Sequence, residues 1–389
     1  MKAYRSFSLL AALVFTLVAC EAAATPSTPI VYNLPPPPES RSFLLGLNPF
    51  PHDFSLDALD EAFEIAGNHA DLLLYHFDSG VPWPEALVGK AYHPVVMENL
   101  EDLVSRRKPG QKLYLAITPN APERNQIALY NEAEESMELP PEWRGKTFSD
   151  PDVVSAYLNH ARFMLDFLKP DYFAYGIEVT CDFTGPQDPL IDEFLVLAEE
   201  VYTTLKAENP DIPIFLTICT GSFQTDDLDS LMASAERVLP YSDYVGISTY
   251  PYWVVPGMKI KEANPADLPD HWFAQWAALA PDKPFAITET GYPAEDLLMP
   301  EHGVKIKGNA AWQADYVAFM LESLNALDAE FIAWFIPRDY DQLYDFLTEQ
   351  YGEFQFYKTW RDTGFYDGAG SVRPALSVWD QWLGAPVEK

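Results

Sequence analysis

The chain has 389 residues, of which 48% are apolar, and its formal net charge is −33 at pH 7. A polyanion would be repelled by so acidic a protein, which argues against nucleic-acid binding because counterion release needs a basic patch. The three cysteines are too few for a disulfide scaffold, and no Cys/His cluster has the spacing of a zinc site.

The first 40 residues are typical of an export and anchoring segment. A short basic lead, MKAYRSF, precedes the apolar run SLLAALVFTLVAC, which is too short to span a bilayer comfortably. The run ends in LVAC at 17–20, which resembles the bacterial lipobox. The resemblance implies a lipoprotein signal peptide over 1–19 and a lipidated Cys20, with an ordinary cleaved signal peptide as the alternative. Residues 20–40 contain four consecutive prolines and are predicted to form a semi-rigid tether.

From residue 41 onward, eight apolar runs alternate with amphipathic segments. The clearest helix covers 154–168, where apolar residues recur with a 3.6-residue period, and others are predicted at about 190–207 and 308–327. Residues 149–152, Ser-Asp-Pro-Asp, have the spacing of a capping box with proline near the first turn. In chain order the apolar runs are 43-FLLGLN-48, 71-DLLLYHF-77, 112-KLYLAIT-118, 172-YFAYGIE-178, 213-PIFLTIC-219, 244-YVGISTY-250, 284-PFAITET-290 and 331-FIAWFIP-337.

Eight strand and helix units over 41–389, without a second linker, describe an α/β protein with one domain, a (β/α)8 TIM barrel. A doubly wound parallel sheet is the alternative. No glycine-rich phosphate turn follows the first predicted strand, so the barrel is favoured.

In such a barrel, catalytic side chains project from the carboxyl ends of the strands. Side chains two residues apart share one face of a strand, so Glu178 is grouped with Gly176, and Glu289 with Ile287. The two glutamates are therefore predicted to point into one pocket, as glycoside hydrolysis by a pair of carboxylates requires. The residues that close the eight runs are Asn48, His76 with Asp78, Thr118 with Asn120, Glu178, Cys219, Tyr250, Glu289, and Trp334 with Arg338.

Several of these motifs together resemble the retaining glycoside hydrolases of clan A. They are Glu178 after strand 4, STYPYW at 248–253, ETGYP at 289–293, and Trp334 on strand 8. The run 363–382, in which Arg-Pro-Ala is followed by tryptophan, also resembles the ending of such barrels. Among the branches, the secreted endo-β-1,4-galactanases and related endo-acting families have the most similar pattern.

The resemblance implies roles for particular residues. Glu178 would be the acid/base, Glu289 the nucleophile, Tyr250 a hydrogen-bond donor to the nucleophile, and Trp334 the floor of the sugar subsite. Two positions depart from the clan pattern. Ile177 stands where asparagine usually binds the sugar 2-hydroxyl, and His76 with Asp78 replaces the usual arginine near the end of strand 2. Either the chain is a divergent branch, or Glu178 is not the acid.

The remaining candidates for substrate binding are Asn48, His76, Asp78, Asn120, Trp253 and Tyr292. Trp253 lies in a loop after strand 6, where its ring could form an apolar platform for a sugar, although a core position is the alternative. His76 equally fits a satisfied histidine beside a carboxylate. Cys181 and Cys219 follow neighbouring strands and are either bonded or two separate buried thiols.

The sequence thus predicts a retaining hydrolase of a β-linked poly- or oligosaccharide that needs no metal or organic cofactor. We expect an exported monomer whose only membrane contact is a lipid anchor in the bacterial cell envelope, on the periplasmic or cell-surface side. Two other classes remain open. One is a catalytically inactive barrel that binds glycans, which Ile177 favours, and the other is an assembly protein that kept the barrel as a scaffold.

Overall fold

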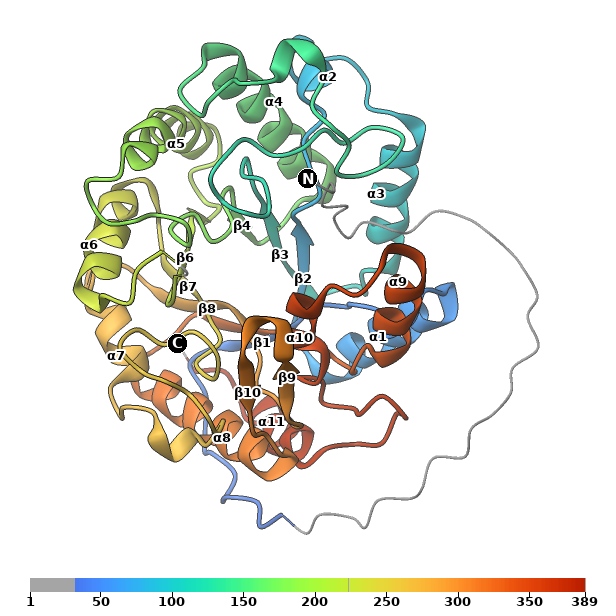
Figure 1. Cartoon of the computed structure of the whole chain (residues 1–389), viewed down its shortest axis with the longest axis vertical. Helices are drawn as coiled ribbons and strands as arrows, with labels where there is room; N and C mark the ends of the chain where they lie inside the picture. The colour runs from blue at the N-terminus through green and yellow to red at the C-terminus, as the bar shows by residue number, and fades with distance from the viewer. Residues whose placement is uncertain (1–31, 223, 389) are drawn as a thin grey trace.

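A computed structural model describes residues 32–222 and 224–388, in which parallel strands form a barrel ringed by helices (Figure 1). The predicted signal peptide, Cys20 and the tether up to residue 31 lie outside these described residues. The parallel strands are β1 (Leu44–Leu47), β2 (Leu72–Phe77), β3 (Lys112–Ile117), β4 (Tyr172–Ala174), β5 (Ile214–Phe215), β6 (Thr217–Cys219), β7 (Val245–Thr249), β8 (Phe285–Thr290) and β11 (Phe331–Trp334). The helices are α1 (Leu56–His69), α2 (Trp83–Val88), α3 (Pro94–Arg106), α4 (Pro151–Leu168), α5 (Pro189–Glu208), α6 (Leu228–Val238), α7 (Trp272–Ala277), α8 (Ala310–Ala326), α9 (Asp341–Tyr351), α10 (Lys358–Arg361) and α11 (Pro374–Leu383).

The strand order confirms the predicted (β/α)8 barrel. Hydrogen bonding runs β5-β4-β3-β2-β1-β11-β8-β7-β6, with every pair parallel. Segments β5 and β6 are the two halves of the fifth predicted strand, separated by Leu216 alone. Because β5 pairs with β4 and β6 pairs with β7, the barrel closes through this divided strand.

The barrel has two apolar layers. Its interior holds large rings beside small residues, such as Tyr114 next to Ala116 and Phe215 next to Ala174. Leu73, Leu115 and Ile287 instead belong to the larger cluster shared with the surrounding helices. The interior cluster consists of Leu72, Leu74, Tyr114, Ala116, Ala174, Ile177, Phe215, Tyr244, Ala286, Phe331 and Ala333. The barrel is therefore a packed core rather than a pore, and only its carboxyl end is available for chemistry.

The three helices predicted from periodicity are present as α4, α5 and α8, but the predicted capping box is absent. Asp150 is the N-cap residue of α4, with proline in the first turn, and its side chain makes no capping hydrogen bond. Lys146 instead forms ion pairs with Asp150 at 3.1 Å and Asp152 at 2.8 Å. A cation within reach thus competes successfully with the helix amides for these carboxylates.

The described end of the predicted tether lies against the barrel. The hydroxyl of Tyr32 donates to the carboxylate of Asp315 on α8 at 2.7 Å, and Asn325 Nδ2 donates to the carbonyl of Ser40. Among the described residues, no helix combines the length and hydropathy needed to cross a membrane.

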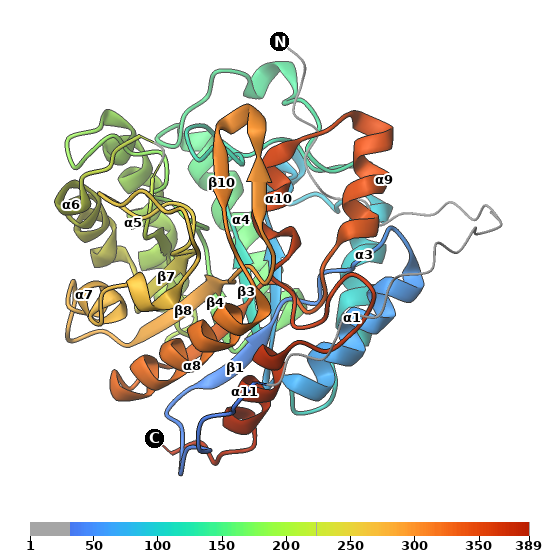
Figure 2. The same cartoon turned by 60° about the horizontal axis from the view of Figure 1, so that its bottom comes forward.

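Two segments after the last strands of the barrel lie side by side (Figure 2). One is the antiparallel hairpin of β9 (Leu297–Met299) and β10 (Val304–Ile306), which follows β8, and the other is the segment of α9 and α10, which follows β11. The backbone amide of Glu301 donates to Gln355 across their contact at 3.1 Å. This pair of insertions builds one wall above the carboxyl end of the barrel.

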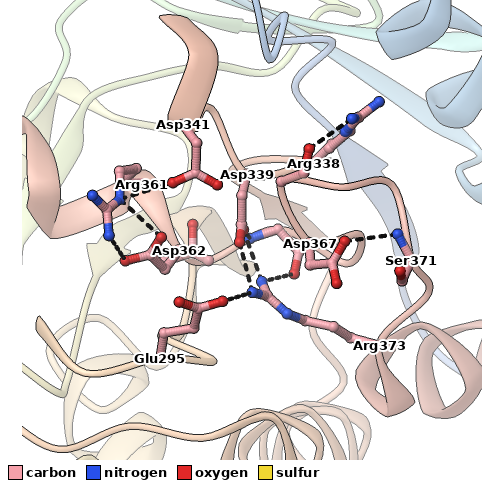
Figure 3. Close-up of polar contacts among 12 residues, drawn as sticks. Glu295, Arg338, Asp339, Asp341, Arg361, Asp362, Asp367, Ser371 and Arg373 are labelled. Carbon is pink, nitrogen blue, oxygen red and sulfur yellow. Dashed lines mark hydrogen bonds and ion pairs between the residues drawn. The ribbon is translucent and has the colours of Figure 1, made fainter. Parts of the chain in front are cut away.

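A buried ion pair joins the C-terminal helix to the loop after β11 (Figure 3). Arg373, the N-cap residue of α11, donates to both carboxylate oxygens of Asp339 at 2.7 and 2.6 Å and to Glu295 at 3.0 Å. Asp339 has no exposed surface and also accepts from the amide of Gly364. Burial raises the pKa of Asp339 to about 8, although Arg373 opposes this shift. The arginine of the Arg-Pro-Ala motif is thus the cation that this buried carboxylate requires.

We expect Arg373→Met to lower the free energy of unfolding by about 3–5 kcal/mol, because it leaves Asp339 buried without its partner. Without Arg373 the pKa of Asp339 in the folded state rises further above about 8, so both proteins lose stability in parallel between pH 5 and 7, and the deficit of the variant grows only as the pH rises through about 8. Urea denaturation at several pH values measures both effects. Arg144→Met, which breaks an exposed pair with Glu138, is the matched control and should cost less than about 1 kcal/mol. A deficit equal to that of the control would show that Asp339 does not depend on Arg373.

Candidate active site

The two predicted glutamates lie in one network of charges at the carboxyl end of the barrel. Glu289 Oε2 is 2.9 Å from His76 Nδ1, and Glu289 Oε1 accepts a 2.5 Å hydrogen bond from the hydroxyl of Tyr250. Glu178 Oε2 is 3.1 Å from Arg124 Nη2, and the same guanidinium pairs with Asp78 at 2.8 Å. The network thus gathers side chains that lie at or beyond the carboxyl ends of β2, β3, β4, β7 and β8.

Glu289 reaches the pocket through an irregularity in β8. Ile247 pairs with Ile287, but the next residue of β7, Ser248, pairs with Glu289, so β8 carries one extra residue here. Ile287 faces the outer helices, and the extra residue allows Glu289 to turn inward. The prediction that these two side chains share a face is therefore wrong, although the predicted pocket position of Glu289 is found. Such bulges are common beside active sites because they redirect a side chain.

Glu178 reaches the same pocket through a left-handed turn. Strand β4 ends at Ala174, four residues before the predicted end, and Glu178 has a φ of 51°. This conformation costs a residue other than glycine about 1–3 kcal/mol, and residues held in such strained conformations cluster at functional sites. Gly176 permits the turn, because a Cβ atom there would lie 2.6 Å from the side chain of Leu216.

The two carboxyl groups have opposite pKa shifts. Burial raises the pKa of Glu178, Arg124 opposes this, the charge of Glu289 adds to it, and the resulting pKa lies above the ordinary value. Burial would also raise the pKa of Glu289, but His76 and the hydroxyl of Tyr250 bring it below the ordinary value. At neutral pH the arrangement favours a proton on Glu178 and a charge on Glu289.

In the clan pattern an arginine stands near the end of strand 2. In this chain His76 lies at that place, and its ring faces Glu289. Burial lowers the pKa of His76, but the charge and hydrogen bond of Glu289 outweigh burial, so its pKa lies above the ordinary value. A protonated His76 and an ionised Glu289 therefore stabilise each other.

Arg124 was missed by sequence reasoning. It lies in the loop after β3 with a φ of 62°, and its side chain is only 7% exposed between Asp78 and Glu178. The loop has no periodicity that would place the residue. The one available signal was Asp78, an acidic residue at the end of strand 2. Because that strand has no arginine, the cation that pairs with Asp78 had to come from another part of the chain.

Three residues predicted to bind substrate are buried, so their predicted positions are wrong. Trp334 has no exposed surface; its Nε1 donates to Thr363, and its ring stacks on Phe365 at 4.8 Å. Tyr292 stacks on Tyr316 at 4.1 Å within the core.

Asn120 is the third residue of this group. It is buried, and its Nδ2 donates to the carbonyl of Arg124 at 3.2 Å, so it supports the arginine loop instead of facing a ligand.

Aromatic rings that are partly exposed continue outward from Tyr250. Its ring contacts Trp360 edge-on at 6.0 Å, Trp360 contacts Phe356 at 5.3 Å, and Phe356 contacts Trp253 at 4.9 Å. Trp253 thus lies beside the pocket, on a wall completed by the insertion after β11. Asn48 is half-buried directly after β1, where its backbone amide donates to the backbone carbonyl of Trp334. Its proposed role remains a prediction.

Cys181 and Cys219 form a disulfide with a Cα–Cα distance of 5.3 Å, which decides between the two alternatives for this pair. Within the described residues, two groups have potential metal ligands in close proximity. In the first, Glu178 lies beside these two cysteines, but their sulfurs are bonded to each other. The second consists of Asp339, Asp341 and Asp362, which already pair with Arg361 and Arg373 (Figure 3).

No protein-family model and no curated protein matches this sequence. The fold does match solved glycoside hydrolases. A GH53 catalytic domain from Ignisphaera aggregans has a TM-score of 0.59 at 16% identity, covering 90% of this chain and 99% of that one. A structure from a study of two fungal β-1,4-galactanases has a TM-score of 0.56 at 14% identity. The match covers 87% of this chain and 99% of the galactanase chain. A GH5_18 protein from Bifidobacterium longum, in complex with Manβ1-4GlcNAc, gives 0.57 at 12% identity, with 89% and 80% covered. The chain therefore shares the (β/α)8 barrel fold of these glycoside hydrolases.

Replacing His76 with glutamine should raise the pKa of Glu289, because the variant lacks the cation at 2.9 Å while burial persists. NMR titration of protein labelled with ¹³C at the glutamate carboxyl carbons measures this pKa, with Glu289→Gln assigning the resonance. His69→Gln is the control, since His69 pairs with Asp380 on α11 instead of with a residue of the site. An unchanged Glu289 titration in His76→Gln would show that Tyr250 and Arg124 alone keep the group ionised.

Proposed function

We propose that this protein is a retaining glycoside hydrolase that cleaves a β-linked poly- or oligosaccharide, with Glu289 as nucleophile and Glu178 as acid/base. The observation that carries the proposal is the opposite direction of the two pKa shifts within one network at the carboxyl end of the barrel. Two carboxylates with separated pKa values are the chemical requirement of this reaction.

In the first step, a carboxylate oxygen of Glu289 attacks the anomeric carbon as the bond to the leaving oxygen breaks. Glu178 transfers its proton to that oxygen, so the leaving group departs as a neutral alcohol. The hydroxyl of Tyr250 and the ring of His76 hold Glu289 from two sides, which fixes the attacking oxygen. A covalent glycosyl ester on Glu289 results.

In the second step, water attacks the anomeric carbon, Glu178 accepts its proton, and the bond to Glu289 breaks. Formation of the ester removes the negative charge of Glu289 and with it the repulsion that raised the pKa of Glu178. Arg124, at 3.1 Å, then favours the ionised form of Glu178 that is needed for a base. The network thus shifts the pKa of Glu178 in the direction that each step requires.

The substrate class is part of the proposal. Similar barrels include β-1,4-galactanases and a protein solved with Manβ1-4GlcNAc, so we propose a β-1,4-linked hexoside as substrate. The partly exposed rings of Trp253, Phe356 and Trp360 support a carbohydrate ligand, because aromatic faces bury the apolar C–H surface of sugars.

Two observations favour a catalytically inactive glycan-binding barrel as the second candidate. Ile177 offers no hydrogen bond to a sugar, and Arg124 stabilises the charged form of Glu178. The clustered carboxylates and rings argue against the third class, a barrel kept only as scaffold, which needs neither.

Trapping the intermediate tests the proposal. We expect 2,4-dinitrophenyl 2-deoxy-2-fluoro-β-glycosides of the galacto, gluco and manno series to label the protein, with the preferred series identifying the sugar. Mass spectrometry of peptides should locate one fluorosugar on Glu289, and Glu289→Gln should remain unlabelled. A label on another residue would reject Glu289 as nucleophile. Saturable binding of β-1,4-oligosaccharides without labelling or turnover would establish the inactive barrel.

We also propose that Cys20 carries a lipid that holds the protein in the cell envelope, as the lipobox resemblance implies. Cys20→Ser should abolish incorporation of labelled palmitate and, where the apolar leader is removed, move the protein from the detergent phase to the aqueous phase, because the acyl chains provide the membrane affinity. Undiminished incorporation of palmitate into the Cys20→Ser protein would contradict this anchor.

A further inference from the structure

The turn that presents Glu178 is held by the neighbouring fifth strand of the barrel. Thr217 Oγ1 accepts a hydrogen bond from the Glu178 amide at 2.7 Å, and the carbonyl of Thr217 accepts one from the Val179 amide at 3.0 Å. On the other side of the turn, the Cys219 amide donates to Thr180 Oγ1 at 3.1 Å. Segment β6 (Thr217–Cys219) is therefore the template on which the left-handed backbone of Glu178 rests.

The Cys181–Cys219 disulfide fastens this turn to its template covalently. Cys181 follows Glu178 by three residues, and its amide donates to the Glu178 carbonyl at 3.2 Å. Cys219 is the last residue of β6, and its Sγ lies 3.9 Å from the same carbonyl. The bond thus links the two segments whose relative position determines where Glu178 lies.

The disulfide also borders the carboxylate itself. A carboxylate oxygen of Glu178 and both sulfur atoms lie within 4.8 Å of one another. A disulfide is uncharged and has no hydrogen to donate, so it borders Glu178 without stabilising the ionised form. Free thiols in its place would be more mobile and would be able to donate hydrogen bonds to the carboxylate.

We propose that the Cys181–Cys219 disulfide is a positioning element for the acid/base function of Glu178, and that its reduction selectively impairs proton transfer to the leaving group. This inference rests on the proposed function. Neither cysteine contacts the sugar in this scheme; both act through the position and surroundings of Glu178.

The selectivity of the defect separates this role from a merely structural one. Substrates with a poor leaving group, such as a β-1,4-linked oligosaccharide, need the proton from Glu178, whereas 2,4-dinitrophenolate departs without it. General acid catalysis typically contributes 10²–10⁴-fold, so Glu178→Ala should show a loss of about that size on the oligosaccharide and a far smaller loss in the first step with the dinitrophenyl glycoside.

The test compares the Cys181→Ala/Cys219→Ala double variant with the wild type on both substrates, using kcat/KM. We expect the loss on the oligosaccharide to exceed the loss on the dinitrophenyl glycoside by about tenfold or more. Azide, which needs no general base, should accelerate dinitrophenyl glycoside turnover in the variant, as in Glu178→Ala. Arg373→Met is the matched control, because it lowers stability at a distance from Glu178 and should not change the ratio between the two substrates.

Reduction of the wild type by a phosphine, followed by thiol counting and circular dichroism, gives the same comparison without mutation if the double variant fails to fold. Equal losses on both substrates, or none, in folded protein lacking the bond would overturn the inference. Absence of turnover and of fluorosugar labelling in the oxidised wild type would instead reject the proposed function, so the two failures are distinguishable.

Discussion

The placement of two acidic groups in one partly buried pocket is the constraint on which the rest of the site depends. Neither Glu178 nor Glu289 is more than 20% exposed, and two adjacent charges of the same sign are costly in such surroundings. The structure resolves the conflict asymmetrically. Glu289 has a histidine and a tyrosine hydroxyl on its two oxygens, whereas Glu178 pairs with Arg124, which it shares with Asp78. Because Glu289 has more partners that stabilise its charge than Glu178 has, the pKa values of the two glutamates move apart.

The fold was predictable from the sequence because a barrel repeats one simple signal. Each strand is an apolar run buried on both sides, and each run leads into an amphipathic helix, so errors of a few residues at the ends of strands do not change the architecture. The site depends on those same ends. The alternation rule led to Glu178 and Glu289, yet neither side chain reaches the pocket by alternation: a left-handed residue directs one and a bulge directs the other.

The errors in the candidate site have a common physical origin. Trp334 and Tyr292 were selected for residue type and position in a motif, but neither property tells whether a ring faces the pocket or the helices; packing against Phe365 and Tyr316 determines this. Arg124 was overlooked for the converse reason, since its loop has no pattern and its position follows from its ion pairs with Asp78 and Glu178, which lie beyond the ends of β2 and β4. A loop residue whose position depends on its ion pairs therefore has no sequence pattern from which it could be predicted.

The left-handed turn at Glu178 also explains the most conspicuous departure from the clan pattern. Phe173 and Tyr175 face the outer layer, and Ala174 faces the interior, as alternation requires, but Ile177 also lies in the interior cluster. The side chain of Ile177 therefore points into the packed interior of the barrel and away from the pocket at its carboxyl end. An asparagine there would be buried without the hydrogen-bond partners that its amide needs, at a cost of about 1–3 kcal/mol. Ile177 is consequently the residue type that this backbone demands, and its presence follows from how Glu178 is presented and does not by itself indicate a loss of catalysis.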